Sequence, residues 1–131
     1  MMLTQAFKLK ESEEICIIDD SPAPMAITKK ICERILPHVP IKTFPNVDSA
    51  ITYLTTVSIQ TRRTIFLDLY MPEKDGWCFL EAYTPTPLDA IYILSSSDAE
   101  SDLSKARLHT KVKDYLMKPL TMATISGLLY Q

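Results

Sequence analysis

The sequence predicts a doubly wound α/β sandwich, in which a parallel sheet carries helices on both faces. Three observations indicate this fold class: five short apolar runs, segments of helical spacing between them, and helix-starting or helix-ending residues at the junctions. Strands and helices that alternate in this way form parallel strands joined by right-handed crossovers. We therefore expect one domain over residues 1–131, with its core at about 14–130.

Five apolar runs are the predicted strands, and Ile and aromatic side chains are prominent in them. This composition is expected for strands that are covered on both faces. In chain order the runs are ICIID at 15–19, PIKTF at 40–44, TIFLDL at 64–69, AIYIL at 90–94 and DYLM at 114–117. No segment reaches the about 18 uninterrupted apolar residues that a membrane span needs.

The segment after the first run has the spacing of an amphipathic helix, because its apolar residues recur at roughly the three-to-four interval that forms one apolar stripe. These residues are Met25, Ile27, Ile31, Ile35 and Leu36. Ser21 followed by Pro22 marks the start of this helix, and Pro37 marks its end.

Similar signals bound the later helices. Asp48-Ser49 and Asp98 each place a short polar capping side chain where a helix should begin. The TPTP stretch at 84–87 closes the third helix, because proline cannot continue it. The chain then reads as strand and helix five times over.

The overall composition is typical of a globular protein and gives no sign of nucleic-acid or membrane binding. Hydrophobic residues make up 47%, charged residues 23%, and the net charge is -2. So small a charge attracts neither nucleic acid nor an anionic membrane. Cys16, Cys32 and Cys78 lie far apart in apolar segments, so we expect buried free thiols rather than a zinc site. Because the N-terminus does not resemble a signal peptide, we expect a cytoplasmic protein.

Three acids stand at the ends of two predicted strands. Asp19 and Asp20 end the first run, and Asp68 lies near the end of the third. If the first and third strands are neighbours, the three carboxylates converge at one edge of the sheet. Two charges ~4 Å apart repel by roughly 4 kcal/mol at an effective dielectric constant of about 20, so either one acid keeps a proton or a cation binds. Oxygen ligands with room for water suit Mg²⁺, and a magnesium site is the sharper hypothesis.

The alternative is that each acid only caps the helix that follows it. Capping fits Asp20, which precedes Ser21 and Pro22, and it requires nothing further of Asp19. It does not account for Asp68, which lies inside TIFLDL. Acid clusters are more often functional than structural, so the sequence favours a site.

Two further polar residues belong to the same edge. Ser95 follows the run AIYIL and Lys118 follows DYLM, as the acids follow their own strands. A hydroxyl and an ammonium group beside a magnesium-carboxylate centre are suited to an incoming phosphoryl group. Ser95 could equally be a turn residue, and Lys118 a solvated lysine before a helix. The bond from Lys118 to Pro119 can be cis, which would aim the lysine inward.

Taken together and in this order, these motifs resemble the receiver domain of two-component response regulators. They are the acidic pair in CIIDDS, the isolated acid in FLDLYMPEKDGW, the hydroxyl in ILSSS and the lysine in YLMKPL. The resemblance covers nearly the whole chain, from about Glu14 to the C-terminus. Each motif alone is weak, whereas all of them on their predicted strands are highly specific. The resemblance implies a flavodoxin-like (βα)5 fold with a parallel sheet of order 2-1-3-4-5.

The resemblance also implies a role for each acid. Asp68 is expected to be the phosphoacceptor and, with Asp20, a direct ligand of Mg²⁺. Asp19 is expected to act mainly through bound water, and the backbone carbonyl of Tyr70 to complete the protein ligands.

The remaining roles concern the phosphoryl group and the switch. The resemblance implies that the Ser95 hydroxyl bonds a phosphoryl oxygen, that Lys118 pairs with the phosphoryl group, and that Tyr115 is the aromatic switch residue. The new bonds would bias a two-state equilibrium in the face built from the fourth helix, fifth strand and fifth helix, at residues 98–126.

The function implied by the resemblance is signalling rather than turnover of small substrates. The phosphoryl donor would be a phosphohistidine on a sensor histidine kinase or a phosphotransfer protein. Since no effector follows in the chain, we expect a stand-alone receiver that acts on a downstream protein target and that could dimerise on phosphorylation. The resemblance does not identify the kinase, the target or the regulated process.

Two other functions remain open from the sequence. One is a magnesium-dependent phosphohydrolase with an aspartate nucleophile, although such sites usually need a second acid where this chain has Tyr70. The other is an interaction module that works without phosphorylation. The complete set of acids, hydroxyl and lysine favours the receiver over both.

Overall fold

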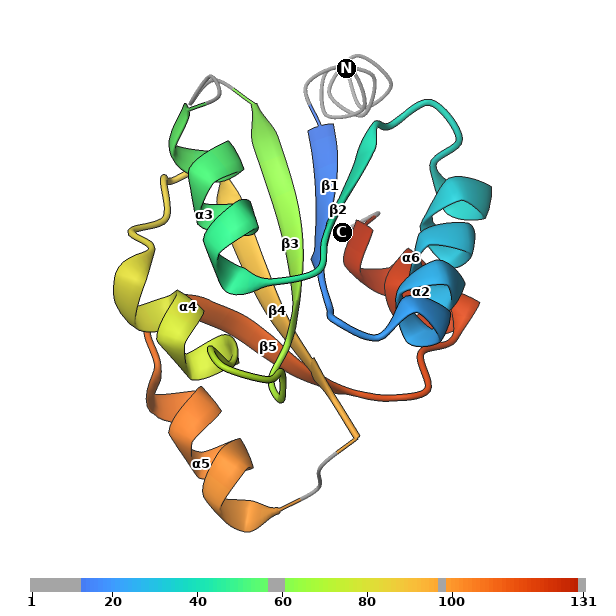
Figure 1. The fold of residues 1–131 in the computed structure, drawn as a ribbon. Coiled ribbons are helices and arrows are strands. Elements are labelled where there is room, and N and C mark those ends of the chain that lie inside the picture. The colour runs from blue at the N-terminus through green and yellow to red at the C-terminus, as the bar shows by residue number, and fades with distance from the viewer. Residues whose placement is uncertain (1–12, 57–60, 97–98, 130–131) are drawn as a thin grey trace.

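The predicted fold class is confirmed in the computed structural model, which describes residues 13–56, 61–96 and 99–129. A five-stranded parallel sheet of order β2-β1-β3-β4-β5 lies between two layers of helices (Figure 1). The strands are β1 (Glu13–Ile18), β2 (Ile41–Phe44), β3 (Arg62–Asp68), β4 (Asp89–Ser95) and β5 (Val112–Met117). The helices are α2 (Pro22–Ile35), α3 (Val47–Thr56), α4 (Gly76–Ala82), α5 (Glu100–Leu108) and α6 (Met122–Leu129).

Each face of the sheet has its own apolar cluster. Helices α3, α4 and α5 contribute side chains to one cluster, and α2 and α6 contribute to the other. Successive strand residues alternate between them: Cys16 and Ile18 belong to the first cluster, and Ile15 and Ile17 to the second. This alternation explains why the strands are apolar throughout. In the described parts of the chain, no helix is both long and apolar enough to cross a membrane.

Three strands begin two residues earlier than the sequence predicts. Strand β1 begins at Glu13, β3 at Arg62 and β5 at Val112. Arg62 pairs with Glu13 of β1, so charged residues take part in the ladder. A prediction from hydropathy places the strand boundary at a charged residue. The backbone N–H and C=O groups, however, pair regardless of the side chain.

The start of α3 corrects the predicted cap. The helix begins at Val47, so Asp48 lies in its first turn rather than before it. The Asn46 side chain caps the helix, because its Oδ1 accepts the Ser49 N–H at 2.8 Å. Several short polar side chains stand within three residues here, and only the backbone geometry selects one of them. Asp98, the predicted cap of α5, lies outside the described residues.

Cys78 corrects the prediction that all three thiols are buried. Cys16 and Cys32 are buried, and burial raises the pKa of both thiols to about 12. Cys78 is exposed, because Phe79 and Leu80 occupy the core-facing positions of α4.

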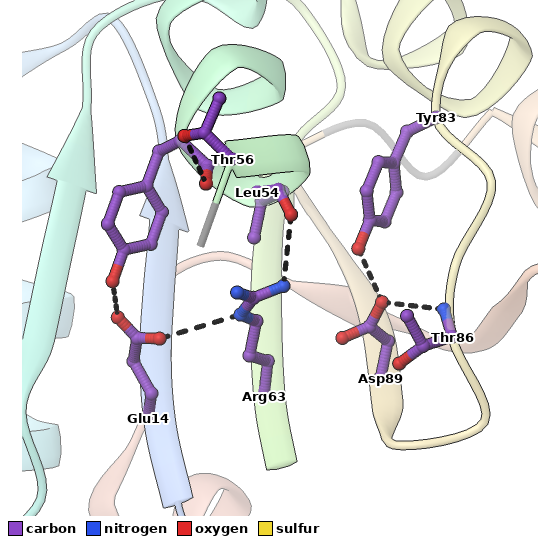
Figure 2. A network of polar contacts seen from close by, with 8 residues as sticks. Glu14, Leu54, Thr56, Arg63, Tyr83, Thr86 and Asp89 are labelled. Carbon is purple, nitrogen blue, oxygen red and sulfur yellow. Dashed lines mark hydrogen bonds and ion pairs between the residues drawn. The ribbon is translucent and has the colours of Figure 1, made fainter. Parts of the chain in front are cut away.

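A buried ionic network lies at the end of the sheet where β1 and β3 begin (Figure 2). Arg63 of β3 is 1% exposed, and its Nε lies 3.5 Å from Oε2 of Glu14 on β1. The Arg63 Nη1 donates to the Leu54 carbonyl in the last turn of α3 at 3.3 Å. The Tyr53 hydroxyl donates to the other Glu14 oxygen. The network therefore joins β1, β3 and α3 through charged side chains that are shielded from water.

A neighbouring polar group joins α4 to β4 at the same end. Asp89 Oδ2 accepts the Tyr83 hydroxyl and the Thr86 N–H (Figure 2). The burial of Tyr83 and its bond to Asp89 raise the pKa of its phenol well above its usual range. Because the hydroxyl stays protonated, it remains a donor at any pH the protein meets.

Replacing Arg63 tests how much the buried ionic network contributes to the free energy of unfolding. Removal of one partner from a buried ion pair leaves an uncompensated charge, so Arg63→Met should lower the free energy of unfolding by about 3 kcal/mol. Urea unfolding measures this change. Arg62→Met is the matched control, because Arg62 is exposed on the same strand and its loss should change stability by less than about 0.5 kcal/mol. Equal stability of the two variants would contradict a stabilising role for the buried Arg63.

Candidate active site

The pairing of β1 with β3 brings the three predicted acids together. Ile18 and Leu67 are partners in the parallel ladder, so the chain leaves both strands at the same edge of the sheet. Asp19 and Asp20 follow Ile18, and Asp68 follows Leu67. One carboxylate oxygen from each acid lies within 4.8 Å of the other two.

Lys118 contacts two of these acids. Its Nζ lies 3.0 Å from Asp19 Oδ2 and 3.5 Å from Asp68 Oδ1. Asp19 is 1% exposed, and its other oxygen accepts the Ser21 N–H at 2.9 Å. The lysine follows β5, and the peptide bond from it to Pro119 is cis. The site therefore contains one ammonium group and three carboxylates, which leaves an excess of negative charge.

Ser95 of β4 lies at the same edge of the sheet as the acids and Lys118. It is the last residue of that strand and is 1% exposed. Its neighbour Leu94 pairs with Asp68, and the Ser95 carbonyl accepts the Lys118 N–H at 2.9 Å. The structure thus carries the serine, the lysine and the acids to one edge of the sheet.

The electrostatic environment of Asp68 is unfavourable for its charged form. The pKa of Asp68 is raised to about 6, first because burial removes the carboxylate from water and also because the Asp19 charge lies nearby. Lys118 opposes this shift, as does a hydrogen bond from the Tyr70 backbone N–H. A carboxylate in this state gains from any added positive charge.

The acid cluster fits a hard divalent cation. Carboxylate oxygens that also leave room for water are the ligands of Mg²⁺, and one oxygen from each acid could meet at a common point. In the part of the chain that the structure describes, no other group of three acid, histidine or cysteine side chains gathers as closely. Burial and the Asp19 charge disfavour the ionised form of Asp68, and a bound cation would favour it.

Tyr70 follows β3 and Tyr115 lies in β5. The Tyr70 ring is 54% exposed, and its hydroxyl donates to Asp102 of α5. Tyr115 of β5 is half-buried against the cluster under α3, α4 and α5. It also lines a surface pocket of about 280 Å³ between α5 and β5.

Gly76 is a residue that the sequence analysis left without a role. A Cβ on Gly76 would lie 2.8 Å from the Asp68 carbonyl oxygen, which is closer than real Cβ atoms approach. Its N–H also donates to the Leu69 carbonyl at 2.9 Å. Glycine is therefore needed to fold the loop back against Asp68. The sequence gives one indication of this role, because the chain has only two glycines and one of them follows Asp68 closely.

A family model and curated relatives of this chain all belong to response regulators. The family model described as "Response regulator receiver domain" matches residues 15–129. The probable C4-dicarboxylate response regulator DctR of Halalkalibacterium halodurans is 23% identical over 121 residues, which cover 89% of this chain and 50% of the relative. The two-component response regulator ORR21 of Oryza sativa subsp. indica is 25% identical over 118 residues, which cover 88% of this chain and 16% of the relative.

Solved structures share the fold. A two component response regulator from Cytophaga hutchinsonii superposes with a TM-score of 0.78 at 24% identity, covering 90% of this chain and 93% of the other. A response regulator receiver protein from Dyadobacter fermentans gives a TM-score of 0.79 at 24% identity, covering 89% and 94%. The chain thus matches these structures over nearly their full lengths, whereas it spans half or less of the curated relatives.

The raised pKa of Asp68 predicts a pH-dependent stability. Its pKa rises from 3.8 to about 6 on folding, so the native protein holds the proton more tightly than the unfolded chain. The stability from this proton is present below pH about 4 and is lost as the pH rises through about 6. Without divalent cations, Asp68→Asn should therefore exceed the wild type in free energy of unfolding by about 1–2 kcal/mol at pH 7.5, after allowance for screening at the mouth of the site.

Urea unfolding at several pH values between 4 and 7.5 measures this difference. It should shrink as the pH falls from 7.5 to 4, because Asp68 in the folded protein then becomes neutral like the asparagine. A variant that is less stable than the wild type at pH 7.5 would show that Lys118 outweighs burial at Asp68.

Proposed function

Because the chain belongs to the response regulator receiver domain family of two-component systems, we propose that Asp68 accepts a phosphoryl group from a phosphohistidine on a partner protein. The observation that carries this proposal is the position of Asp68, which is 7% exposed, beside two further acids and 3.5 Å from the Lys118 ammonium group. This arrangement supports attack by one carboxylate on an anionic phosphorus.

The transfer exchanges one bond for another. An Asp68 carboxylate oxygen attacks the phosphorus, an O–P bond forms, and the P–N bond to the donor imidazole breaks with its electron pair left on nitrogen. The Lys118 ammonium group, already within 3.5 Å of Asp68, neutralises charge on the phosphoryl oxygens. The buried Ser95 hydroxyl donates a hydrogen bond to one of these oxygens once the group is in place.

Asp20 and Asp68 would hold Mg²⁺ directly, Asp19 would act mainly through bound water, and the Tyr70 carbonyl would complete the protein ligands. The support is the meeting of three carboxylate oxygens within 4.8 Å. When bound, Mg²⁺ offsets the repulsion between the anionic carboxylate and the anionic phosphoryl group. It also favours the ionised form of Asp68, which is the nucleophilic one.

The output would lie on α5, β5 and α6, within the predicted range 98–126, of which Asp98 is outside the described residues. Ser95 ends β4 next to this face, and Tyr115 lies half-buried on β5. A new bond from Ser95 to the phosphoryl group would bias the position of Tyr115 and the pocket between α5 and β5. A histidine kinase or phosphotransfer protein is the proposed donor, and a downstream protein the proposed reader of this face.

Phosphorylation by a small donor tests the proposal. With acetyl phosphate and Mg²⁺, intact-mass measurement should find one phosphoryl group on the wild type and none on Asp68→Asn, because the amide oxygen is a far weaker nucleophile. Asp114→Asn is the matched control, since this acid is exposed on β5 away from the cluster and its loss should leave the adduct unchanged.

Each other outcome identifies a different function. No adduct on the wild type with any phosphodonor would reject phosphoacceptance and favour a module that works by binding alone. Rapid turnover of donor esters without a lasting adduct would instead favour a phosphohydrolase.

Ser95→Ala tests the proposed switch apart from the transfer. Loss of one hydrogen bond should slow phosphorylation by only about fivefold. The variant should nevertheless lose the change in amide hydrogen exchange of α5 and β5 that phosphorylation causes in the wild type. Ser96→Ala is the control, because Ser96 is the exposed neighbour. If Ser95→Ala keeps the full exchange response, the switch does not run through this hydroxyl.

A further inference from the structure

A single tyrosine connects the reacting carboxylate to helix α5. Tyr70 stands two positions after Asp68, in the loop between β3 and α4. Its backbone N–H donates to the Asp68 carboxylate, and its side-chain hydroxyl donates to the carboxylate of Asp102. The two bonds use opposite ends of one residue, so Asp68 and α5 are joined by one amino acid.

Asp102 is an unusual residue for the position it holds. It lies in the first turn of α5 and is only 9% exposed. A buried carboxylate is costly unless it accepts hydrogen bonds, and the Tyr70 hydroxyl supplies one. An acid in the first turn is also favoured by the helix dipole, which explains its tolerance there but not its burial against Tyr70.

Helix α5 has few other buried attachments. Asp102 and Ala106 are its buried residues, and the other side chains of this helix are exposed or half-buried. Lys105 adds a contact at the surface, where its Nζ lies 4.3 Å from the centre of the Trp77 ring. Because Asp102 is the buried residue in the first turn of α5, the bond from Tyr70 is one of the contacts that hold this turn.

We propose that Asp102 is a positioning residue for the phosphorylation site, and that its hydrogen bond from Tyr70 is a second link between Asp68 and α5, separate from Ser95. This inference rests on the proposed function, since it assigns a role in the phosphorylation of Asp68. Asp102 holds the Tyr70 side chain and thereby fixes the backbone N–H that faces the Asp68 carboxylate. The coupling is reciprocal: if the position of α5 affects Asp68, then the state of Asp68 affects α5 by the same free energy.

The loop between Asp68 and α4 shows why such a link is effective. Glu73 has a positive φ of 66°, and Gly76 packs directly against the Asp68 carbonyl. The loop is therefore tightly folded at its far end. Residue 70 lies at the near end, and the bond to Asp102 fixes its side chain to a separate element.

The test compares four single variants and one double variant with the wild type. Tyr70→Phe keeps the ring and removes the donor, Asp102→Leu removes the acceptor, and Asp102→Asn keeps an acceptor oxygen without the charge. The matched control is Tyr53→Phe, which removes the same kind of bond, from a tyrosine hydroxyl to a buried carboxylate, at the opposite end of the sheet.

The first measurement is the rate of phosphorylation by acetyl phosphate with saturating Mg²⁺. Tyr70→Phe and Asp102→Leu should each lower the maximal rate by about fivefold, the factor that one net hydrogen bond corresponds to, with little change in KM. The double variant combines Tyr70→Phe with Asp102→Leu. It should be no slower than either single variant, because both changes remove the same bond. Asp102→Asn should remain within about twofold of the wild type, because its amide oxygen still accepts the hydroxyl.

The second measurement is amide hydrogen exchange in α5, with and without phosphorylation. Tyr70→Phe and Asp102→Leu should speed exchange at the first turn of α5 in the unphosphorylated protein and reduce its response to phosphorylation. Tyr53→Phe should lower global stability without either effect. A merely structural role of Asp102 would change stability and leave the maximal rate and the α5 response as in the wild type.

The outcomes separate the two proposals. If the wild type and Tyr53→Phe are phosphorylated and Tyr70→Phe and Asp102→Leu match them in rate and in α5 response, the link is rejected and the proposed function stands. If the wild type forms no adduct, the proposed function fails and the link fails with it.

Discussion

The structure depends on one constraint: the parallel pairing of β1 with β3 forces acidic side chains of both strands into a shared volume. Ile18 and Leu67 are ladder partners, so Asp19, Asp20 and Asp68 cannot move apart without breaking the central pair of strands. Like charges held this closely oppose folding, and Lys118 offsets only part of that cost. The protein thus carries an unfavourable charge arrangement that a bound cation would relieve.

The two ends of the sheet differ in their balance of charge: one has an excess of carboxylates, and the other has a paired arginine and glutamate. At the carboxyl ends of the strands, three acids face one lysine near water. At the other end, Arg63 and Glu14 are both buried, and Tyr53 and the Leu54 carbonyl satisfy part of their remaining hydrogen-bonding capacity. The buried pair joins β1 to β3 and so helps fix the register on which the acid cluster depends.

The lightly buried helix α5 is the part of the proposed output face that bonds to the loop after Asp68. Asp102 and Ala106 are its buried residues, so a polar contact is one of its two buried attachments. Asp102 meets the loop that carries Tyr70, whereas Ser95 reaches the same face through β4 and β5. If Asp68 is phosphorylated as proposed, α5 would sense the change through Tyr70 and β5 would sense it through Ser95.

The sequence by itself determined the fold class, the strand order implied by the resemblance, and which polar side chains stand at strand ends. Strand periodicity and strand-end position are local properties of the sequence, and they predict that Asp68, Ser95 and Lys118 share one edge of the sheet. The strand order follows from the resemblance alone. Only the tertiary structure decided that Asn46 caps α3, that Cys78 is exposed, that Gly76 packs against Asp68, and that Tyr70 bonds Asp102. These features depend on distances between segments far apart in the chain or on backbone angles, and neither is encoded in hydropathy.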